Sequence, residues 1–148
     1  MKTVFLTGAT GNMGREAMKE LLSRSDRFQI KILVLPHEKN KPLVQEWEQK
    51  PNVTIVYGDL TNYDDVLESV TGADYVLHVG GMVAPMADYH PALTTKVNIG
   101  AAKNIVKAIQ SQPNKDTIKL VYIGTVAQTG DRNPPIHWGR TGDPIKIS

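Results

Sequence analysis

The sequence predicts an α/β fold, a doubly wound parallel β-sheet with helices on both faces. Three observations predict it. Short apolar runs alternate with segments of helical periodicity, a glycine-rich turn joins the first such pair, and 41% of the 148 residues are hydrophobic, enough for a core. Alternating strands and helices give parallel strands joined by right-handed crossovers. We expect the strand order 3-2-1-4-5, with a ligand crevice between strands one and four, where the order reverses.

The elements follow from these patterns in chain order. Apolar runs predict strands at residues 3–6, 28–35, 53–57, 73–79 and 118–123. Helices are expected at 15–23, from Pro42 to about residue 50, from Thr61 or Asn62 to Gly72, and at 91–111, with residues 80–90 as a loop. The inward faces of these helices are expected to carry Met13, Ala17, Leu21 and Leu22; Leu43, Val44 and Trp47; Val66, Leu67 and Val70; and Leu93, Val97, Ala101, Ile105, Ala108 and Ile109.

The glycine-rich turn at residues 7–14 lies between the first strand and the first helix. Gly8 permits a sharp turn, Gly11 permits backbone approach to a pyrophosphate, and Gly14 permits close packing of the helix on the strand. The helix start supplies N–H groups and a partial positive charge for phosphates. The alternative is a glycine turn that binds nothing. The candidate cofactor contacts of the turn are Gly8, Thr10, Gly11, Asn12, Met13 and Gly14.

The spacing G-x-x-G-x-x-G, with its leading threonine in the first strand, resembles the short-chain dehydrogenase/reductase superfamily. Later segments resemble its extended branch of NAD(P)-dependent epimerases, dehydratases and reductases. The resemblance implies an NAD(P)-binding, Rossmann-like domain over residues 1–125. The segment 126–148, rich in proline and glycine, is expected to be irregular and to lead to a catalytic helix beyond Ser148. The chain is accordingly expected to be truncated before the C-terminal strands and the substrate domain.

The resemblance also implies cofactor contacts after strands three and four. Asp59, followed by Leu60, would accept a hydrogen bond from the adenine amino group; the alternative is that Asp59 only caps the next helix. Val79, Gly80 and Gly81 would pass close to the ribose on the nicotinamide side, whereas His78 is expected to be a structural residue. Asn98 would support the site through backbone contacts, the alternative being an exposed side chain.

The end of strand five carries the catalytic candidate. The resemblance implies that the Thr125 hydroxyl hydrogen-bonds the substrate oxygen beside the nicotinamide, with Ile123 against the cofactor; a threonine that only satisfies a turn is the alternative. The family's Tyr-x-x-x-Lys pair, in which the lysine lowers the pKa of the tyrosine, is absent, since none of the five tyrosines is followed by lysine at that spacing. In relatives the tyrosine falls at a position beyond Ser148.

Cofactor choice depends on the end of strand two. Pro36 stands where an acid would contact the ribose of NAD, so the NAD signature is absent. His37 and Lys39 could accept the 2′-phosphate of NADP, although Glu38 lies between them. NADP is modestly favoured over NAD.

Composition limits the partners. The net charge of +2 is spread without a basic block, which argues against nucleic acid and membrane surfaces. There is no cysteine, signal peptide or membrane-length apolar run, and no metal site is predicted, so a cytoplasmic protein is expected. The expected function is hydride transfer on a sugar nucleotide or small carbonyl substrate, by a protein that forms a homo-oligomer. The alternative is a non-catalytic NAD(P)-binding regulator.

Overall fold

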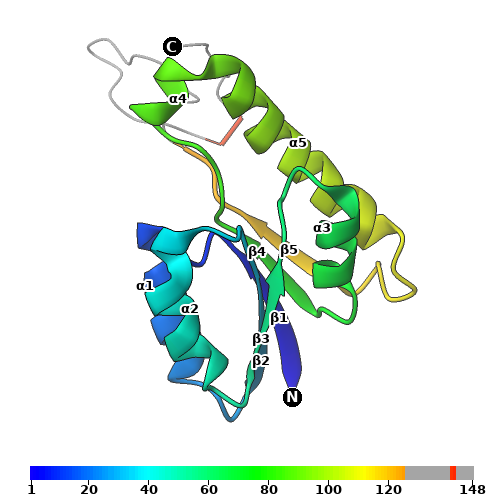
Figure 1. Ribbon diagram of the computed structural model, residues 1–148. Helices are drawn as coiled ribbons and strands as arrows, with labels where there is room; N and C mark the ends of the chain where they lie inside the picture. Colours follow the sequence, from blue (N-terminus) through cyan, green and yellow to red (C-terminus); the bar gives the residue numbers. More distant parts are fainter. Residues whose placement is uncertain (126–140, 143–148) are drawn as a thin grey trace.

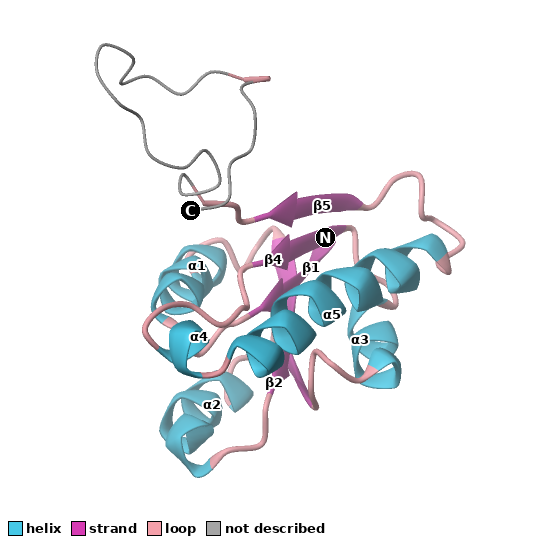
Figure 2. Cartoon of the chain, turned by 90° about the horizontal axis from the view of Figure 1, so that it is seen from above, coloured by secondary structure: helices cyan, strands magenta, loops and turns pink. Residues whose placement is uncertain are grey.

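The computed structural model describes residues 1–125, 141 and 142, together with all side chains there except that of Glu38. The five strands form one parallel sheet in the order β3-β2-β1-β4-β5, as predicted. Helices α1 and α2 cover one face of the sheet, and α3 and α5 cover the other (Figures 1 and 2). Most of the predicted irregular segment 126–148 lies outside the described residues.

The elements alternate along the chain as expected. The strands are β1 (Lys2–Thr7), β2 (Phe28–Val34), β3 (Val53–Tyr57), β4 (Tyr75–His78) and β5 (Lys119–Tyr122). The helices are α1 (Asn12–Leu22), the 3-10 turn η1 (Glu38–Asn40), α2 (Lys41–Glu48), α3 (Tyr63–Val70), α4 (Met86–Tyr89) and α5 (Pro91–Gln110).

The core consists of two apolar layers because the central strands are buried on both faces. Successive side chains of a strand point to opposite faces, so Val4 and Leu6 pack toward α1 and α2, while Phe5 packs toward α3 and α5. Met18, Val44 and Trp47 complete the first layer, and among the residues of the second are Val66, Val70, Ile105 and Ala108. This packing fixes the carboxyl ends of β1 and β4 next to each other, with Thr7 opposite His78.

Several sequence predictions about the bounds of the elements and about burial were wrong. Helix α1 begins at Asn12 rather than at residue 15, and Met13 is 59% exposed, while Met18 is buried in the core. Leu93 is 48% exposed because the first half of α5 extends beyond the sheet (Figure 1). The segment expected to be a loop contains the short helix α4.

Strand β5 differs from the central strands, which are buried on both faces, because all four of its residues are exposed. Within the described residues, no helix has both the length and the apolar character needed to cross a bilayer.

Candidate functional site

The turn between β1 and α1 has the geometry expected of Gly8 and Gly14. Gly8 adopts a φ of +69°, and a Cβ there would lie 2.6 Å from the Cα of Gly80. A Cβ on Gly14 would lie 1.9 Å from the carbonyl oxygen of Gly8. Distances below about 3 Å are excluded by atomic size, so both glycines are required by the fold itself.

Gly11 differs from these two glycines. A Cβ there would meet only the Gly8 carbonyl oxygen, at 3.4 Å, and the backbone of Gly11 is extended, with φ −77° and ψ 172°. The described protein therefore has room for a side chain at this position. Gly11 is also the N-cap of α1, whose start has no side-chain cap and no acidic residue in its first turn. An open, uncapped helix start of this kind suits an anion such as a pyrophosphate.

The hydroxyl of Thr7 joins the glycine turn to the end of β4. Its oxygen accepts the backbone N–H groups of Val79 and Gly80, at 3.1 and 2.9 Å. With its lone pairs engaged, the hydroxyl donates its proton to Nδ1 of His78, at 2.8 Å. His78 is therefore neutral with its proton on Nε2, and burial lowers its pKa below the usual 6.5. The expectation that His78 is structural agrees with this bonding.

The residues after β4 pack against three other segments. A Cβ on Gly80 would lie 3.1 Å from each of the Gly8 nitrogen, the Thr7 hydroxyl and Cδ1 of Leu60. A Cβ on Gly81 would lie 3.1 Å from Oδ1 of Asn98. Glycine at both positions thus permits a close approach of the backbone, since a Cβ would require its neighbours to shift by a few tenths of an ångström.

Asn98 makes the expected backbone contacts. Its Oδ1 accepts the N–H of Met82 at 2.7 Å, and its Nδ2 donates to the Met82 carbonyl at 2.9 Å. The alternative of a merely exposed side chain is therefore wrong. These two bonds fix the segment after β4 to helix α5.

Asp59 is exposed at the end of β3, and it is not the cap of α3. Its Oδ1 accepts the N–H of Thr61 at 2.7 Å, whereas the N-cap is Asn62, which accepts the N–H of Asp64 at 3.0 Å. The backbone N–H of Asp59 is held by Asp65 at 2.8 Å. Asn104 of α5 donates to the Leu60 carbonyl at 2.9 Å, which fixes Leu60 beside Gly80.

A pocket of about 660 Å³ brings together many of the predicted site residues at the carboxyl ends of β4 and β5. The predicted residues that line it are Met13, Val79, Gly80, Gly81, Asn98, Ile123 and Thr125. Thr10, Gly11, Asn12, Asp59 and Leu60 are not among the described residues that line it, so it covers one end of the predicted site.

The residues predicted to choose the cofactor lie elsewhere on the same sheet edge, after β2. Pro36, His37 and Lys39 are all exposed, and nothing is described of the Glu38 side chain. Pro36 and His37 line a second pocket of about 400 Å³, between the end of β2 and α2. His37 accepts the N–H of Lys39 at Nδ1, 3.1 Å away. Its Nε2 is thereby the ring nitrogen that can donate to a ligand.

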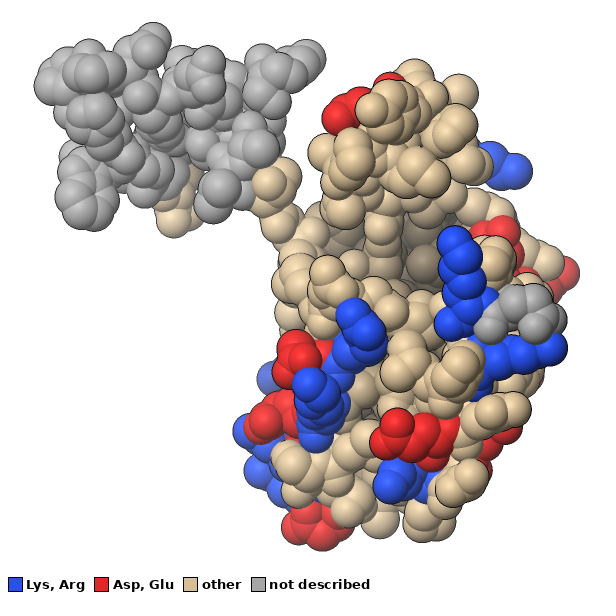
Figure 3. All heavy atoms as spheres, turned by 60° about the vertical axis from the view of Figure 1, so that its left-hand side comes forward, with Lys and Arg blue, Asp and Glu red and all other residues tan. Residues whose placement is uncertain are grey.

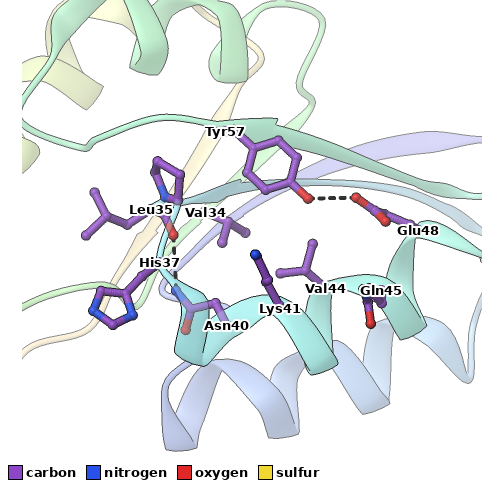
Figure 4. A pocket seen from close by; sticks show the side chains of 10 residues that line it. Val34, Leu35, His37, Asn40, Lys41, Val44, Gln45, Glu48 and Tyr57 are labelled. Carbon is purple, nitrogen blue, oxygen red and sulfur yellow. Dashed lines mark hydrogen bonds between the residues drawn. The ribbon is translucent and has the colours of Figure 1, made fainter.

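Figure 4 shows that this second pocket also contains side chains from α2 and β3. Lys41 extends from the start of α2, and the Tyr57 hydroxyl donates to Glu48 at 2.6 Å, which raises the pKa of Tyr57. Asn40 donates to the Leu35 carbonyl at 3.1 Å and fixes the turn. Among the described residues, Lys41 lines this pocket and Lys39 does not.

Sequence reasoning missed Thr7 and Lys41 as residues of the site. Thr7 lies in a buried strand, and its place at the head of the glycine motif was the signal for a role at the turn, although no contact was predicted for it. Lys41 lies two residues beyond Lys39 at the start of a helix that was expected to begin with Pro42.

The fold and the turn together define a class of protein. A parallel sheet in the order 3-2-1-4-5, with a glycine turn leading into an uncapped helix at its switch point, is a Rossmann-like dinucleotide-binding fold. The chain belongs to the NAD dependent epimerase/dehydratase family, whose model matches residues 4–145.

Individual relatives agree with this assignment. UDP-glucose 4-epimerase of Rickettsia bellii is 26% identical over 72% of this chain and 32% of its own length. Human 3 beta-hydroxysteroid dehydrogenase type 7 is 27% identical over 98% of this chain and 39% of its own length. The Bordetella bronchiseptica enzyme WbmH, solved in complex with NAD+, shares the fold with a TM-score of 0.77 at 22% identity, over 99% of this chain and 46% of that one. The chain thus spans less than half the length of each.

Proposed function

We propose that this chain is the NAD(P)-binding part of an epimerase, dehydratase or reductase that transfers hydride on a sugar nucleotide or small carbonyl compound. The observation that carries the proposal is the open space at Gly11, where the protein itself does not require glycine but a pyrophosphate would. Family membership supports the same cofactor. The bound dinucleotide would supply the hydride donor or acceptor.

Each part of the cofactor has candidate residues in this chain. The turn from Gly8 to Gly14 would hold the pyrophosphate, and Asp59 with Leu60 would face the adenine. Val79, Gly80 and Gly81 would face the ribose next to the nicotinamide. Their support is that Thr7 and Leu60 connect these three segments through the contacts described above.

Thr125 is the proposed catalytic residue, and its hydroxyl would hydrogen-bond the reacting oxygen of the substrate. This role is supported by the fact that Thr125 lines the same pocket as Gly80, Gly81 and Met13. The 148 residues contain no Tyr-x-x-x-Lys pair to move the proton. We therefore expect the chain to bind cofactor without turnover.

Substitution of Gly11 tests cofactor binding directly. Gly11→Ala places a methyl group where the pyrophosphate approaches, so NAD and NADP affinity should fall at least about tenfold while the fold is kept. Gly100→Ala is the matched control, because a Cβ there meets nothing within 4 Å. Isothermal titration calorimetry on both variants gives the affinities, and circular dichroism reports the fold. Equal affinity in the two variants would refute the phosphate assignment.

A modest preference for NADP over NAD is the finer proposal, supported by the exposed His37 and Lys39 and by Pro36 in place of an acid. Lys39→Met should weaken NADP binding by about two- to fivefold and leave NAD binding unchanged, because a surface charge contact with a phosphate contributes up to about 1 kcal/mol. Competition binding at low and high salt provides the measurement, since screening reduces only the charged contact. Tighter binding of NAD at both salt concentrations would show that the ribose, not a phosphate, is recognised.

A further inference from the structure

The ring of His78 uses only one of its two nitrogens within the described part of the chain. Nδ1 accepts the Thr7 hydroxyl at 2.8 Å, so the ring proton lies on Nε2. Every fully buried side-chain nitrogen or oxygen of the described residues has a hydrogen-bond partner, whereas Nε2 has none among them. His78 is 4% exposed and lines the pocket beside Gly80 and Gly81. The Nε2–H group is therefore the part of the ring that is open to this pocket.

Two contacts fix the orientation of the ring. The first is the bond from Thr7, which a rotation of the imidazole would break. The second is the ring of Tyr122, which lies 5.4 Å away between centroids at an angle of 53°. Parallel pairing of β4 with β5 places Tyr122 opposite His78. The Nε2–H group is thus oriented before any ligand binds, which lowers the entropic cost of a hydrogen bond to it.

The surroundings of this donor are uncharged. None of the described residues that line the pocket is Asp, Glu, Lys or Arg. In Figure 3 the hollowed region below the α4 end is tan, and most of the charged residues lie lower down. Burial lowers the pKa of His78 below 6.5, so the imidazole is a neutral donor at pH 7. Gly11 and Asn12, where the pyrophosphate is proposed to bind, are not among the described lining residues. The pocket therefore suits an uncharged oxygen better than a phosphate.

A ligand that fills the pocket removes water from the Nε2–H group, and a buried donor without an acceptor is costly. The ligand must therefore present an acceptor at this point. We propose that Nε2 of His78 donates a hydrogen bond to an uncharged oxygen in the nicotinamide half of the bound dinucleotide, a ribose hydroxyl or the carboxamide oxygen. The inference rests on the proposed function and adds a binding role to a residue that the sequence marks only as structural.

Two amide variants separate this binding role from the structural one. The amide of His78→Asn occupies the Nδ1 position and can accept from Thr7, but it leaves no donor at Nε2. The amide of His78→Gln reaches the Nε2 position and can donate there, but it loses the bond to Thr7. We expect NAD affinity, measured by calorimetry, to fall about three- to tenfold in His78→Asn and less in His78→Gln. Urea denaturation should give the opposite order, with His78→Gln less stable. NAD affinities that follow the order of stability would overturn the inference.

Fragments of the cofactor show which oxygen is bound. ADP lacks the nicotinamide half, and ADP-ribose contains the second ribose without the nicotinamide. ADP affinity should be equal in the unsubstituted chain and in His78→Asn. Weaker binding of ADP-ribose by His78→Asn would assign the ribose hydroxyl, whereas a loss for NAD alone would assign the carboxamide. A loss for ADP as large as that for NAD would mean that the substitution acts only through the fold, and this would overturn the inference.

The imidazole proton can also be observed directly in the unsubstituted chain. In proton–nitrogen correlation NMR spectra of the histidine side chains, the Hε2 signal of His78 should move downfield when NAD is added and stay in place when ADP is added. The signal is assigned by its loss in His78→Asn. An unmoved signal, or equal NAD affinity with and without the substitution, would overturn the inference while cofactor binding stands. A chain that binds no NAD would refute the proposed function itself, and the inference with it.

Discussion

At the scale of single residues, the Thr7 hydroxyl organises the site. Its oxygen accepts two backbone N–H groups after β4, and the hydroxyl donates its proton to Nδ1 of His78, so the glycine turn and the pocket are joined through a single side chain. Such an arrangement requires His78 to remain unprotonated at Nδ1. The ionisation of His78 is therefore coupled to the stability of the folded chain.

The pH dependence of stability follows from this coupling. Burial lowers the folded pKa of His78 below 6.5, so the imidazole is neutral in both states above that pH and its contribution is fully present. As the pH falls through this value, the unfolded chain binds a proton that the folded chain does not, and the free energy of unfolding falls. We expect urea denaturation to show this loss between about pH 7 and 5.

His78→Asn is the matched variant, because its side-chain oxygen can accept from Thr7 but does not titrate. The loss between pH 7 and 5 should shrink in this variant. Asp74 acts in a separate range, since its hydrogen bond from Lys2 and its bond from the Thr3 N–H lower its pKa below 3.8. An unchanged pH profile in His78→Asn would contradict the assignment.

At the scale of secondary-structure elements, the glycine spacing determines how α1 lies on β1. The Gly14 position has no room for a Cβ next to the Gly8 carbonyl, whereas the Gly11 position has room for one. The three glycines therefore have separate roles, two in the fold and one proposed for the ligand. This separation predicts different consequences for the same substitution.

Gly14→Ala should destabilise the chain by about 3 kcal/mol or more, because the overlap must be relieved by moving α1 away from β1. Gly100→Ala should be neutral or stabilising by up to about 1 kcal/mol, since alanine favours a helix more than glycine does and a Cβ at this position meets nothing within 4 Å. Thermal unfolding followed by circular dichroism would measure both. A Gly14→Ala melting temperature close to that of the original chain would mean that the helix start is less constrained than these contacts indicate.

At the scale of the whole molecule, burial is uneven across the sheet. The first four strands contribute to the two core layers, but β5 packs beside β4 with Leu120, Val121 and Tyr122 at 39%, 48% and 58% exposure. An exposed apolar edge strand favours pairing with a further strand. We infer that the 148-residue chain by itself self-associates through this edge.

Val121→Lys should weaken that association, because a charge on an edge strand opposes strand pairing. Analytical ultracentrifugation over a range of concentrations would show a self-associating chain and a more monomeric variant. Lys119→Arg, on the same strand, keeps the charge and serves as the control. A chain that is monomeric at all concentrations would refute the inferred oligomer.

The sequence by itself determined the strand order, the parallel sheet and the glycine turn, because these depend on local periodicity and on backbone geometry that glycine permits. It also predicted that Asn98 makes backbone contacts, which the structure shows. The exposure of Met13 and Leu93 could not be derived from periodicity. A helix shows which residues share a face, but only the tertiary structure decides how far the sheet extends beneath that face.

The connections between distant segments were decided only by the tertiary structure. The bond between Thr7 and His78 joins residues 71 positions apart, and parallel pairing of β1 with β4 is what brings them into register. The two pockets and the inclusion of Lys41 likewise depend on how α2 and α5 pack beside the strand ends. Side-chain chemistry can be recognised in the sequence, whereas its grouping into a site depends on long-range packing.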